Sequence, residues 1–272
     1  MKSRGHGRYE AGDFCWVGLA TSDPSAAQAF YTGLFGWTGE TLSAGSAGVF
    51  TILRREGEDV ALLYRQTAQA RAAAAAPHWT SFVSVDDAQA TAVRAAELGG
   101  AVTFREPFDI LDAGRVAAIR DPTGGNLSLW QPGERIGATV VNVVGALCWT
   151  ELTTSDVEGA KSFFGELFGW TYESDAGGYT TIRSAGRRNG AIRQQEVSGR
   201  DVKPGWTPYF KVEKTEHAVV RAERLGGRRL AKTARSPLGR FAAIADPQHA
   251  AFAVVEGTTT VSHEHPVPEL HS

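Results

Sequence analysis

The sequence is short of the features that mark secreted, membrane-spanning and nucleic-acid-binding proteins. It has two cysteines in 272 residues, too few for a disulfide framework. No apolar run approaches the roughly 20 residues that span a bilayer, and no apolar stretch follows the basic N-terminus MKSRGHGRYEAGDF, as it would in a secretory signal. The formal net charge of -2 gives no electrostatic case for binding nucleic acid or an anionic membrane. We therefore expect a globular protein of a reducing cytoplasm.

What the sequence does contain is a long internal repeat. CWVGLATSDPSAAQAFYTGLFGW (15–37) recurs 133 residues later as CWTELTTSDVEGAKSFFGELFGW (148–170). HWTSF recurs 127 residues later as GWTPY, and Asp121-Pro122 recurs 125 residues later as Asp246-Pro247. The shrinking offset means that the second copy has lost residues in two connections, where deletions are tolerated. Copies of about 120 residues are too long for solenoid repeats, so they indicate two homologous domains.

The repeat divides the chain into five expected segments. Residues 1–11 form a flexible arm, 12–135 the first domain, 136–144 a linker, 145–257 the second domain and 258–272 a flexible tail. Three of the seven histidines lie in the tail, whose polar, proline-containing sequence is typical of a disordered end rather than of a metal site.

Each domain shows the same order of strands and helices. After a short strand, Asp23 caps a helix that has Pro24 in its first turn, and the buried face carries apolar residues at i, i+3, i+4 and i+7. Gly36 and Gly169 end the two copies of this helix. A strand pair follows, and then a second strand, a helix from Asp86 or Asp87 to Leu98, and further strands. Short hairpins after each helix predict a mainly antiparallel sheet with helices outside, an α+β fold.

Three motifs resemble those of the vicinal oxygen chelate superfamily: SDPSAAQAFYTGLFGW, the paired Asp residues followed by LGG, and GR-x4-I-x-DPTGGNLSLWQ. This superfamily includes glyoxalases, bleomycin-resistance proteins and extradiol dioxygenases. The resemblance covers about residues 12 to 257 and occurs twice, and it is nearest to two-domain actinobacterial members described as glyoxalase-like or hydroxylase-like. It implies four βαβββ units that form two half-open barrels, each around a cavity.

The resemblance also implies where metal ligands would stand, and this sequence departs from the pattern there. Metal-using members place His or Glu at three positions of a domain. In this chain the first domain has Trp16, Thr80 and Ser128 there, and the second has Trp149, Thr207 and Ala253. Indole and methyl groups do not ligate a hard divalent cation, and neutral hydroxyls do so poorly. We therefore expect neither a metal nor another cofactor.

Alternation along the strands predicts the cavity walls, since residues two apart point the same way. The expected lining of the first cavity is Trp16, Gly18, Ala20, His78, Thr80, Phe82, Ser128 and Trp130, and that of the second is Trp149, Glu151, Thr153, Gly205, Thr207, Tyr209, Ala253 and Val255. Aromatic walls with few polar groups suit a hydrophobic or flat organic ligand. Large aromatic residues in a sheet also serve as plain core, and the sequence leaves that reading open.

Glu151 stands where the first copy has Gly18. An inward carboxylate between Trp149 and Thr153 would be desolvated, which would raise its pKa and suit it to general acid or base catalysis. Tyr209 is its expected partner, whereas the first domain has Phe82 there and His78 as its single titratable lining group. The alternative is that Glu151 lies at the rim and pairs with an arginine such as Arg193.

Three functions follow from these observations. The first is a metal-independent lyase, isomerase or hydroxylase-like enzyme of secondary metabolism, which acts on a hydrophobic or aromatic, polyketide-like metabolite by acid/base chemistry in the second cavity. The second is a binding protein of the bleomycin-resistance type, and the third is a divalent-metal lyase or dioxygenase. The expected partner is a small molecule, without nucleic acid or membrane, and the expected assembly is a pseudo-symmetric monomer or weak homodimer.

Overall fold

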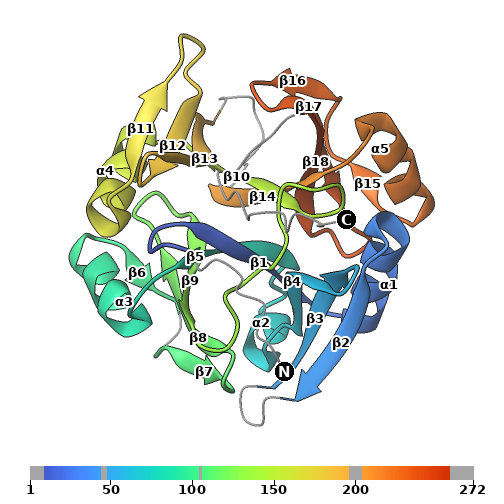
Figure 1. The fold of residues 1–272 in the computed structure, drawn as a ribbon, viewed down its shortest axis with the longest axis horizontal. Coiled ribbons are helices and arrows are strands. Elements are labelled where there is room, and N and C mark those ends of the chain that lie inside the picture. Colours follow the sequence, from blue (N-terminus) through green and yellow to red (C-terminus); the bar gives the residue numbers. More distant parts are fainter. Residues whose placement is uncertain (1–8, 44–47, 104–105, 196–203, 258–272) are drawn as a thin grey trace, which may run out of the picture.

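The computed structural model describes residues 9–43, 48–103, 106–195 and 204–257. Residues 1–8 of the expected arm and the whole expected tail, 258–272, lie outside the described residues. In the described part, the chain forms two sheets with helices around their outer sides (Figure 1). None of the described helices combines the length and the apolar character that crossing a bilayer requires.

The first domain follows the order predicted from the sequence. Its elements are β1 (Phe14–Thr21), α1 (Pro24–Phe35), β2 (Thr38–Ser43), β3 (Val49–Arg55), β4 (Glu58–Arg65), α2 (Ala68–Ala72), β5 (His78–Ser84), α3 (Ala88–Glu97), β6 (Ala101–Val102), β7 (Phe108–Ile110), β8 (Gly114–Arg120) and β9 (Asn126–Pro132).

The second domain repeats this order in its described residues, and residues 196–203, between β13 and β14, lie outside them. Its elements are β10 (Leu147–Thr154), α4 (Val157–Phe168), β11 (Thr171–Ser174), β12 (Thr180–Ser184), β13 (Arg187–Gln194), β14 (Gly205–Lys211), α5 (Thr215–Arg224), β15 (Arg228–Arg229), β16 (Ala234–Ser236), β17 (Gly239–Ala245) and β18 (Ala251–Glu256).

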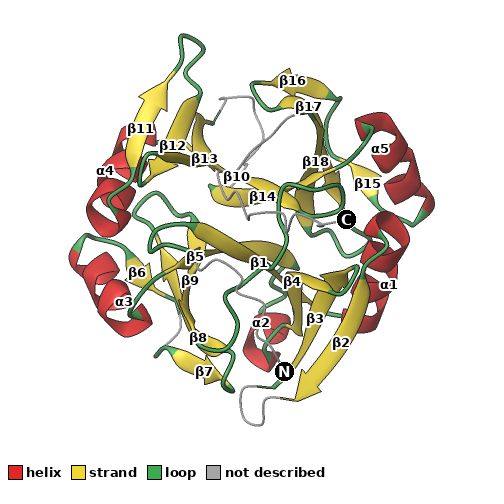
Figure 2. Cartoon of the chain, in the orientation of Figure 1, coloured by secondary structure: helices red, strands yellow, loops and turns green. Residues whose placement is uncertain are grey.

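Each domain is built on one nine-stranded sheet. In the first sheet the order is β2-β3-β4-β1-β5-β9-β8-β6, with β7 paired to β8, and the second sheet repeats it (Figure 2). The β1–β4 and β5–β9 pairs are parallel and the other pairs of this sheet are antiparallel. The antiparallel β1–β5 pair joins two βαβββ-type units into one curved sheet, which confirms the predicted tandem of half-open barrels.

Local sequence accounts for the first helix. The Asp23 side chain accepts hydrogen bonds from the backbone N–H groups of Ser25 and Ala26, and Pro24 occupies the first turn, where no N–H is needed. Gly36 ends the helix in the left-handed conformation, at φ 76°, which favours glycine. The predicted face is buried and consists of Ala27, Phe30, Tyr31 and Leu34.

The two domains pack closely through their helices and aromatic side chains. Helix α1 contacts α5, and α3 contacts α4. Both helices α1 and α3 of the first domain therefore lie beside a helix of the second domain (Figure 1). The core around α1 includes Phe210 and Phe252 from the second domain, and the core around α4 includes Phe14 from the first. The indole N–H of Trp37 donates to the Gly145 carbonyl at 2.7 Å.

The structure corrects the boundary of the expected flexible arm. Tyr9 is buried, and its hydroxyl donates to the Ala138 carbonyl at 2.8 Å. The Ala138 N–H in turn donates to the Cys15 carbonyl. Packed structure therefore begins by Tyr9, because the segment expected as a linker passes over the start of β1 and supplies partners for it.

Candidate functional site

The first sheet curves around a cavity of about 600 Å³. This volume lies within the range of pockets that hold small organic molecules. Its middle is predominantly apolar and is lined by side chains from six strands: Phe50, Leu62, Tyr64, Phe82, Phe108, Ile110, Val116, Ala118 and Ser128. The cavity is therefore suited to a hydrophobic ligand.

Polar groups line one end of this first cavity. Ser25 and Gln28 come from the first turns of α1, and Gln66 and Thr67 follow the end of β4. The Gln66 amide already donates to the carbonyls of Ala75 and Ala76, so its amide nitrogen is held by the chain. This end can solvate a polar substituent of a ligand whose body lies among the apolar side chains.

Tyr64 forms a neutral part of the wall. Burial raises the pKa of the Tyr64 hydroxyl, and a hydrogen bond with Thr80 opposes that rise only in part. The phenol therefore stays protonated at neutral pH and serves as a hydrogen-bonding group rather than as a base.

Gly18 makes room for the aromatic wall. A Cβ at this position would lie 2.9 Å from the Phe82 ring and 3.3 Å from the Tyr64 ring. Both distances are shorter than ordinary carbon contacts. Phe82, which was predicted to stand opposite Gly18, is one of these neighbours, and Tyr64 is a second that was not predicted. Glycine is needed here because two rings pack over the backbone of β1.

A small extension adjoins the first cavity at the N-terminal end of β1. It measures about 20 Å³ and shares Phe50, Leu62 and Ile110 with the larger cavity. Trp16 and Trp130 line this extension, with ring centroids 5.4 Å apart. These two tryptophans were predicted for the main cavity, and the structure places them at its end.

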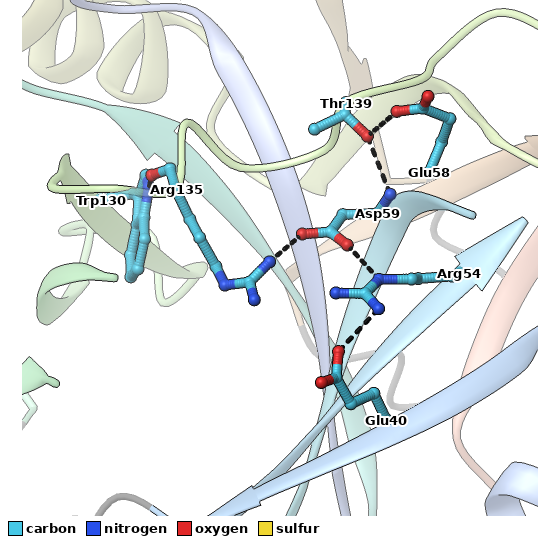
Figure 3. A network of polar contacts seen from close by, with 7 residues as sticks. All are labelled: Glu40, Arg54, Glu58, Asp59, Trp130, Arg135 and Thr139. Carbon is cyan, nitrogen blue, oxygen red and sulfur yellow. Dashed lines mark hydrogen bonds and ion pairs between the residues drawn. The ribbon is translucent and has the colours of Figure 1, made fainter. Parts of the chain in front are cut away.

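A polar network closes this end of the barrel (Figure 3). The Asp59 carboxylate binds the guanidinium groups of Arg54 and Arg135, and its backbone N–H donates to the Thr139 hydroxyl. The Trp130 indole donates to the Arg135 carbonyl at 3.0 Å. The expected linker is therefore attached to the first barrel through Thr139, just after Arg135, and the Trp130 donor is already used.

The interior of the second barrel is organised around Glu151. The residue is 3% exposed, so it lies inside the barrel and not at its rim. The Tyr209 hydroxyl donates to Glu151 Oε1 at 3.2 Å, and Arg193 Nε lies 3.4 Å from the same oxygen. Glu151 Oε2 is buried and has no hydrogen-bond partner among the described residues. The pairing with Arg193 was predicted only for a rim position, and the structure combines that pairing with burial.

Burial also sets the protonation of this site. Desolvation raises the pKa of the Glu151 carboxyl, and Arg193 and the hydroxyls of Tyr179 and Tyr209 oppose the rise. Burial likewise raises the pKa of Tyr209 well above its ordinary range, with the charge of Glu151 adding to the effect. The site thus holds one carboxyl that titrates above its usual range next to phenols that stay protonated.

The register of the sheets shows how the two interiors have diverged. Gly18 pairs with Leu62 as Glu151 pairs with Ala191, and Ala20 pairs with Tyr64 as Thr153 pairs with Arg193. Following the same register, four positions of the first barrel are replaced by more polar residues in the second: Gly18 by Glu151, Phe50 by Tyr179, Tyr64 by Arg193 and Phe82 by Tyr209. The carboxylate and its partners therefore differ between the domains as a set.

The residues at the metal positions of the superfamily do not fit a divalent metal. On β1, β5 and β9 they supply the indole of Trp16 and the hydroxyls of Thr80 and Ser128, and the second barrel replaces the last of these with the methyl group of Ala253. Such a set lacks the imidazole, carboxylate or thiolate ligands that bind Zn²⁺, Mn²⁺ or Fe²⁺. Within the described residues, no three His, Cys, Asp or Glu side chains are grouped so as to hold a metal ion.

The predicted site residues fall into three groups in the structure. Phe82 and Ser128 line the first cavity, and Trp149, Glu151 and Tyr209 lie together inside the second barrel. Other predicted positions lie nearby on the paired strands: Thr80 beside Gly18, Thr207 beside Glu151, Thr153 beside Gly205 and Ala253 beside Tyr209.

His78 is a correction to the predicted site. It lies at the start of β5, is exposed, and its Nδ1 lies 3.0 Å from the Ala76 carbonyl. It is not among the residues that line the first cavity. Alternation assigned it to the face of Thr80 and Phe82, but it is the exposed first residue of β5, where the strand begins.

Sequence reasoning missed the walls that come from β3, β4, β7, β8 and α1. Phe50 and Tyr64 are neighbours across β3 and β4, and Phe108 lies on the short strand β7. The alternation of apolar residues in VFTIL and VALLY could have predicted that Phe50 and Tyr64 face inward. The short strand β7 gave none, because three residues are too few to show a period.

Comparisons with known proteins agree with this architecture. The model of the Glyoxalase/Bleomycin resistance protein/Dioxygenase superfamily matches residues 14–128. "Putative glyoxylase CFP32" of Mycobacterium tuberculosis is 36% identical over 254 residues, which cover 91% of this chain and 96% of that protein. Anthracycline biosynthesis protein DnrV of Streptomyces peucetius is 33% identical over 264 residues, which cover 92% of this chain and 94% of that protein.

A solved structure shares the fold at low sequence identity. The Mn(II)-bound glyoxalase from Novosphingobium aromaticivorans matches with a TM-score of 0.63 at 14% identity, over 95% of this chain and 88% of that one. The two-barrel architecture, the duplicated motifs and the full-length relatives lead to the same conclusion. The chain belongs to the Glyoxalase/Bleomycin resistance protein/Dioxygenase superfamily.

Proposed function

We propose that the protein binds a hydrophobic or aromatic, polyketide-like small molecule in the first cavity, without a metal ion. One observation carries this proposal: a cavity of about 600 Å³ has an apolar middle and polar groups at one end. Flat aromatic molecules with polar substituents match such a distribution. The relative named for anthracycline biosynthesis supports the same class of ligand and a role in secondary metabolism.

Titration calorimetry with anthraquinone-2-sulfonate, a soluble three-ring probe, tests the proposal. Ala118 lines the first cavity, and Ala118→Trp should fill it and abolish binding. The register makes Ala243 the counterpart in the second barrel, since Ala118 pairs with Ser128 as Ala243 pairs with Ala253. Ala243→Trp should therefore leave binding unchanged. Loss of binding in Ala243→Trp alone would assign the ligand to the second barrel instead.

A second candidate function is turnover of such a molecule in the second barrel. The observation that favours it is the buried carboxyl of Glu151, whose Oε2 has no hydrogen-bond partner in the part of the chain that the structure describes and whose pKa is raised by desolvation. In this candidate Glu151 is the general acid or base and Tyr209 holds it in position. Mass spectrometry of the bound compound before and after incubation separates the two functions, because a sequestering protein returns the compound unchanged.

A further inference from the structure

Among the described residues that line the first cavity, one side chain is charged, that of Arg65. Arg65 is the last residue of β4 and is exposed at the polar end of the cavity. No aspartate or glutamate is found among these lining residues. The described wall therefore carries a positive charge, although the formal net charge of the whole chain is -2.

The Arg65 guanidinium has no counter-ion within the described residues. Other arginines of the first domain are paired with carboxylates: Arg54, Arg55, Arg94, Arg115 and Arg135. The Arg65 side chain makes neither an ion pair nor a hydrogen bond in the part of the chain that the structure describes. The Asp23 carboxylate caps α1 instead, by accepting from the N–H groups of Ser25 and Ala26. The guanidinium therefore keeps its donors for a ligand.

The charge at this position distinguishes the first barrel from the second. Arg65 pairs with Thr21 across β4 and β1, as Gln194 pairs with Thr154 across β13 and β10. Gln194 is neutral, and its amide donates to the Ser155 carbonyl at 3.0 Å. The cation thus stands on the barrel that encloses the cavity of about 600 Å³.

The helix at this end of the cavity also differs between the domains. Ser25 and Gln28 of α1 line the cavity, and α1 contains no acidic residue. The repeat offset of 133 residues aligns them with Glu158 and Lys161 of α4, which form an ion pair at 2.8 Å. The first domain therefore offers neutral hydrogen-bonding groups near Arg65, where the second domain has a carboxylate.

Arg65 also adjoins the apolar part of the cavity. It directly follows Tyr64, and the Cα atoms of consecutive residues are about 3.8 Å apart. Both residues line the cavity, although successive side chains of a strand point to opposite faces. The cavity therefore extends past the end of β4, and an aromatic ring that packs against Tyr64 can direct a substituent toward the guanidinium.

We propose that Arg65 pairs with an acid group of the ligand, and that the first cavity therefore prefers aromatic carboxylic acids to neutral molecules of the same shape. A guanidinium matches a carboxylate with two parallel N–H donors. Ser25 and Gln28 can donate to the same oxygens from α1. The inference rests on the proposed function of the first cavity and adds a charge to the class of ligand.

Two probes with the same three-ring skeleton test the role of Arg65 by titration calorimetry. At pH 7.5 anthraquinone-2-carboxylate is an anion, and anthraquinone-2-carboxamide is neutral and of nearly the same shape. The wild-type protein should bind the carboxylate roughly fivefold more tightly in 50 mM NaCl, as expected for one charge pair near the surface. This preference should shrink in 500 mM NaCl, because salt screens the pair.

Arg65→Gln introduces the residue type of the second barrel and should remove the preference by weakening the carboxylate alone. Arg65→Lys keeps the charge without the planar fork and should keep part of the preference. Arg120→Gln is the matched control, because Arg120 belongs to the same domain but does not line the cavity. It should retain the full preference.

A further variant tests the same contact without altering Arg65. Ser25→Glu places a carboxylate on the cavity wall, as Glu158 does at the equivalent position of α4. An acidic residue in the first turn suits a helix, so the fold should be kept. The new carboxylate should compete for Arg65 and repel the anionic probe, and the preference should again disappear while the affinity for the carboxamide stays the same.

The outcomes separate this inference from the proposed function. Equal wild-type affinity for the two probes, or a preference that survives in both Arg65→Gln and Ser25→Glu, would overturn the role of Arg65 and leave the cavity as a binding site. Failure of both probes to bind would overturn the inference together with the proposed function.

Discussion

The indole nitrogen of Trp37 lies 2.7 Å from the carbonyl oxygen of Gly145, at the start of the second domain. Trp170 of the second domain makes the corresponding bond to the carbonyl oxygen of Gly12 in the first domain, also at 2.7 Å. Both bonds are buried. The two domains are therefore joined by a symmetric pair of hydrogen bonds inside an aromatic interface.

Trp37→Phe should lower the free energy of unfolding by about 1–3 kcal/mol, because it leaves a buried carbonyl without its donor. Trp170→Phe should cost less, because the Gly12 carbonyl keeps its hydrogen bond from the Asn189 side chain. Trp16→Phe is the control, since the Trp16 N–H has no hydrogen-bond partner within the described residues, and it should cost less than Trp37→Phe. Urea unfolding measures all three, and an equal loss in all three variants would mean that ring volume, not the hydrogen bond, dominates.

Gly18→Ala should destabilise the protein by roughly 1–3 kcal/mol through crowding in the first barrel. The added methyl group would meet the Phe82 ring at 2.9 Å. Gly165→Ala in α4 is the matched control: its nearest contact would be an ordinary 3.5 Å, and alanine favours a helix by about 0.5–1 kcal/mol. The two substitutions should therefore shift the thermal midpoint in opposite directions, and a shared sign would contradict the crowding.

Glu151 should make stability depend on pH in a specific sense. Because the pKa of Glu151 is raised in the folded state, the folded protein holds this proton more tightly than the unfolded chain does. The stability that Glu151 contributes is fully present below the unfolded pKa of about 4.3, and it is lost as pH rises through the folded pKa.

Urea unfolding of the wild type and Glu151→Gln over a pH series measures this effect. The difference between them isolates Glu151, since other buried carboxyls such as Asp121 and Asp246 are common to both. The wild type should lose stability relative to the variant as pH rises above about 4.3, by at most ~1.4 kcal/mol per pH unit. A difference that does not change with pH would show that the carboxyl titrates normally.

If the second barrel turns its ligand over, Glu151→Gln should reduce turnover by roughly two to four orders of magnitude with little change in binding. Tyr209→Phe should reproduce part of this defect, because the Tyr209 hydroxyl donates to Glu151. Weaker binding with unchanged turnover would instead give Glu151 a role in orienting the ligand. A fully active Glu151→Gln enzyme would remove this mechanism.

Removal of divalent metals should not affect binding of anthraquinone-2-sulfonate. The residues at the superfamily's metal positions, such as Trp16 and Trp149, are poor ligands for such ions. Elemental analysis after dialysis against EDTA, followed by titration with the probe, measures both metal content and affinity. About one Zn, Fe, Ni or Mn per chain before chelation, and loss of binding after it, would contradict the expectation.

The architecture could be predicted from the sequence because a duplicated pattern supports each element twice. Asp23 and Asp156 both begin a helix, Gly36 and Gly169 both end one, and in each pair the same residue type performs the same local task. The strand expected from Ala101 is present as β6, but the short strand β7 was not predicted. It pairs with β8 through tertiary contacts, and three residues have no period of their own.

The candidate site could be predicted only in part, for a different reason. Alternation identified which side chains of β1 and β5 face inward, including Glu151 in the equivalent β10, because pleating alone decides this. It did not reveal that the first barrel keeps an open cavity while Tyr179 and Tyr209 are buried with Trp149 inside the second. That difference depends on side chains from several strands and on the curvature of the sheet.

The contacts of the first strand have a consequence for the order of folding. Near the start of the chain, the Gly12 carbonyl accepts a hydrogen bond from the Asn189 side chain, and the Phe14 N–H donates one to it. The Phe14 ring packs against Trp206. At roughly 5–20 residues per second, the ribosome delivers these partners on the order of ten seconds or more after the strand itself. During synthesis, the aromatic side chains at this edge of the first barrel therefore stay exposed until the second domain has been made. Docking of the two domains is a late folding step of high contact order, and chaperones can protect the exposed side chains before it.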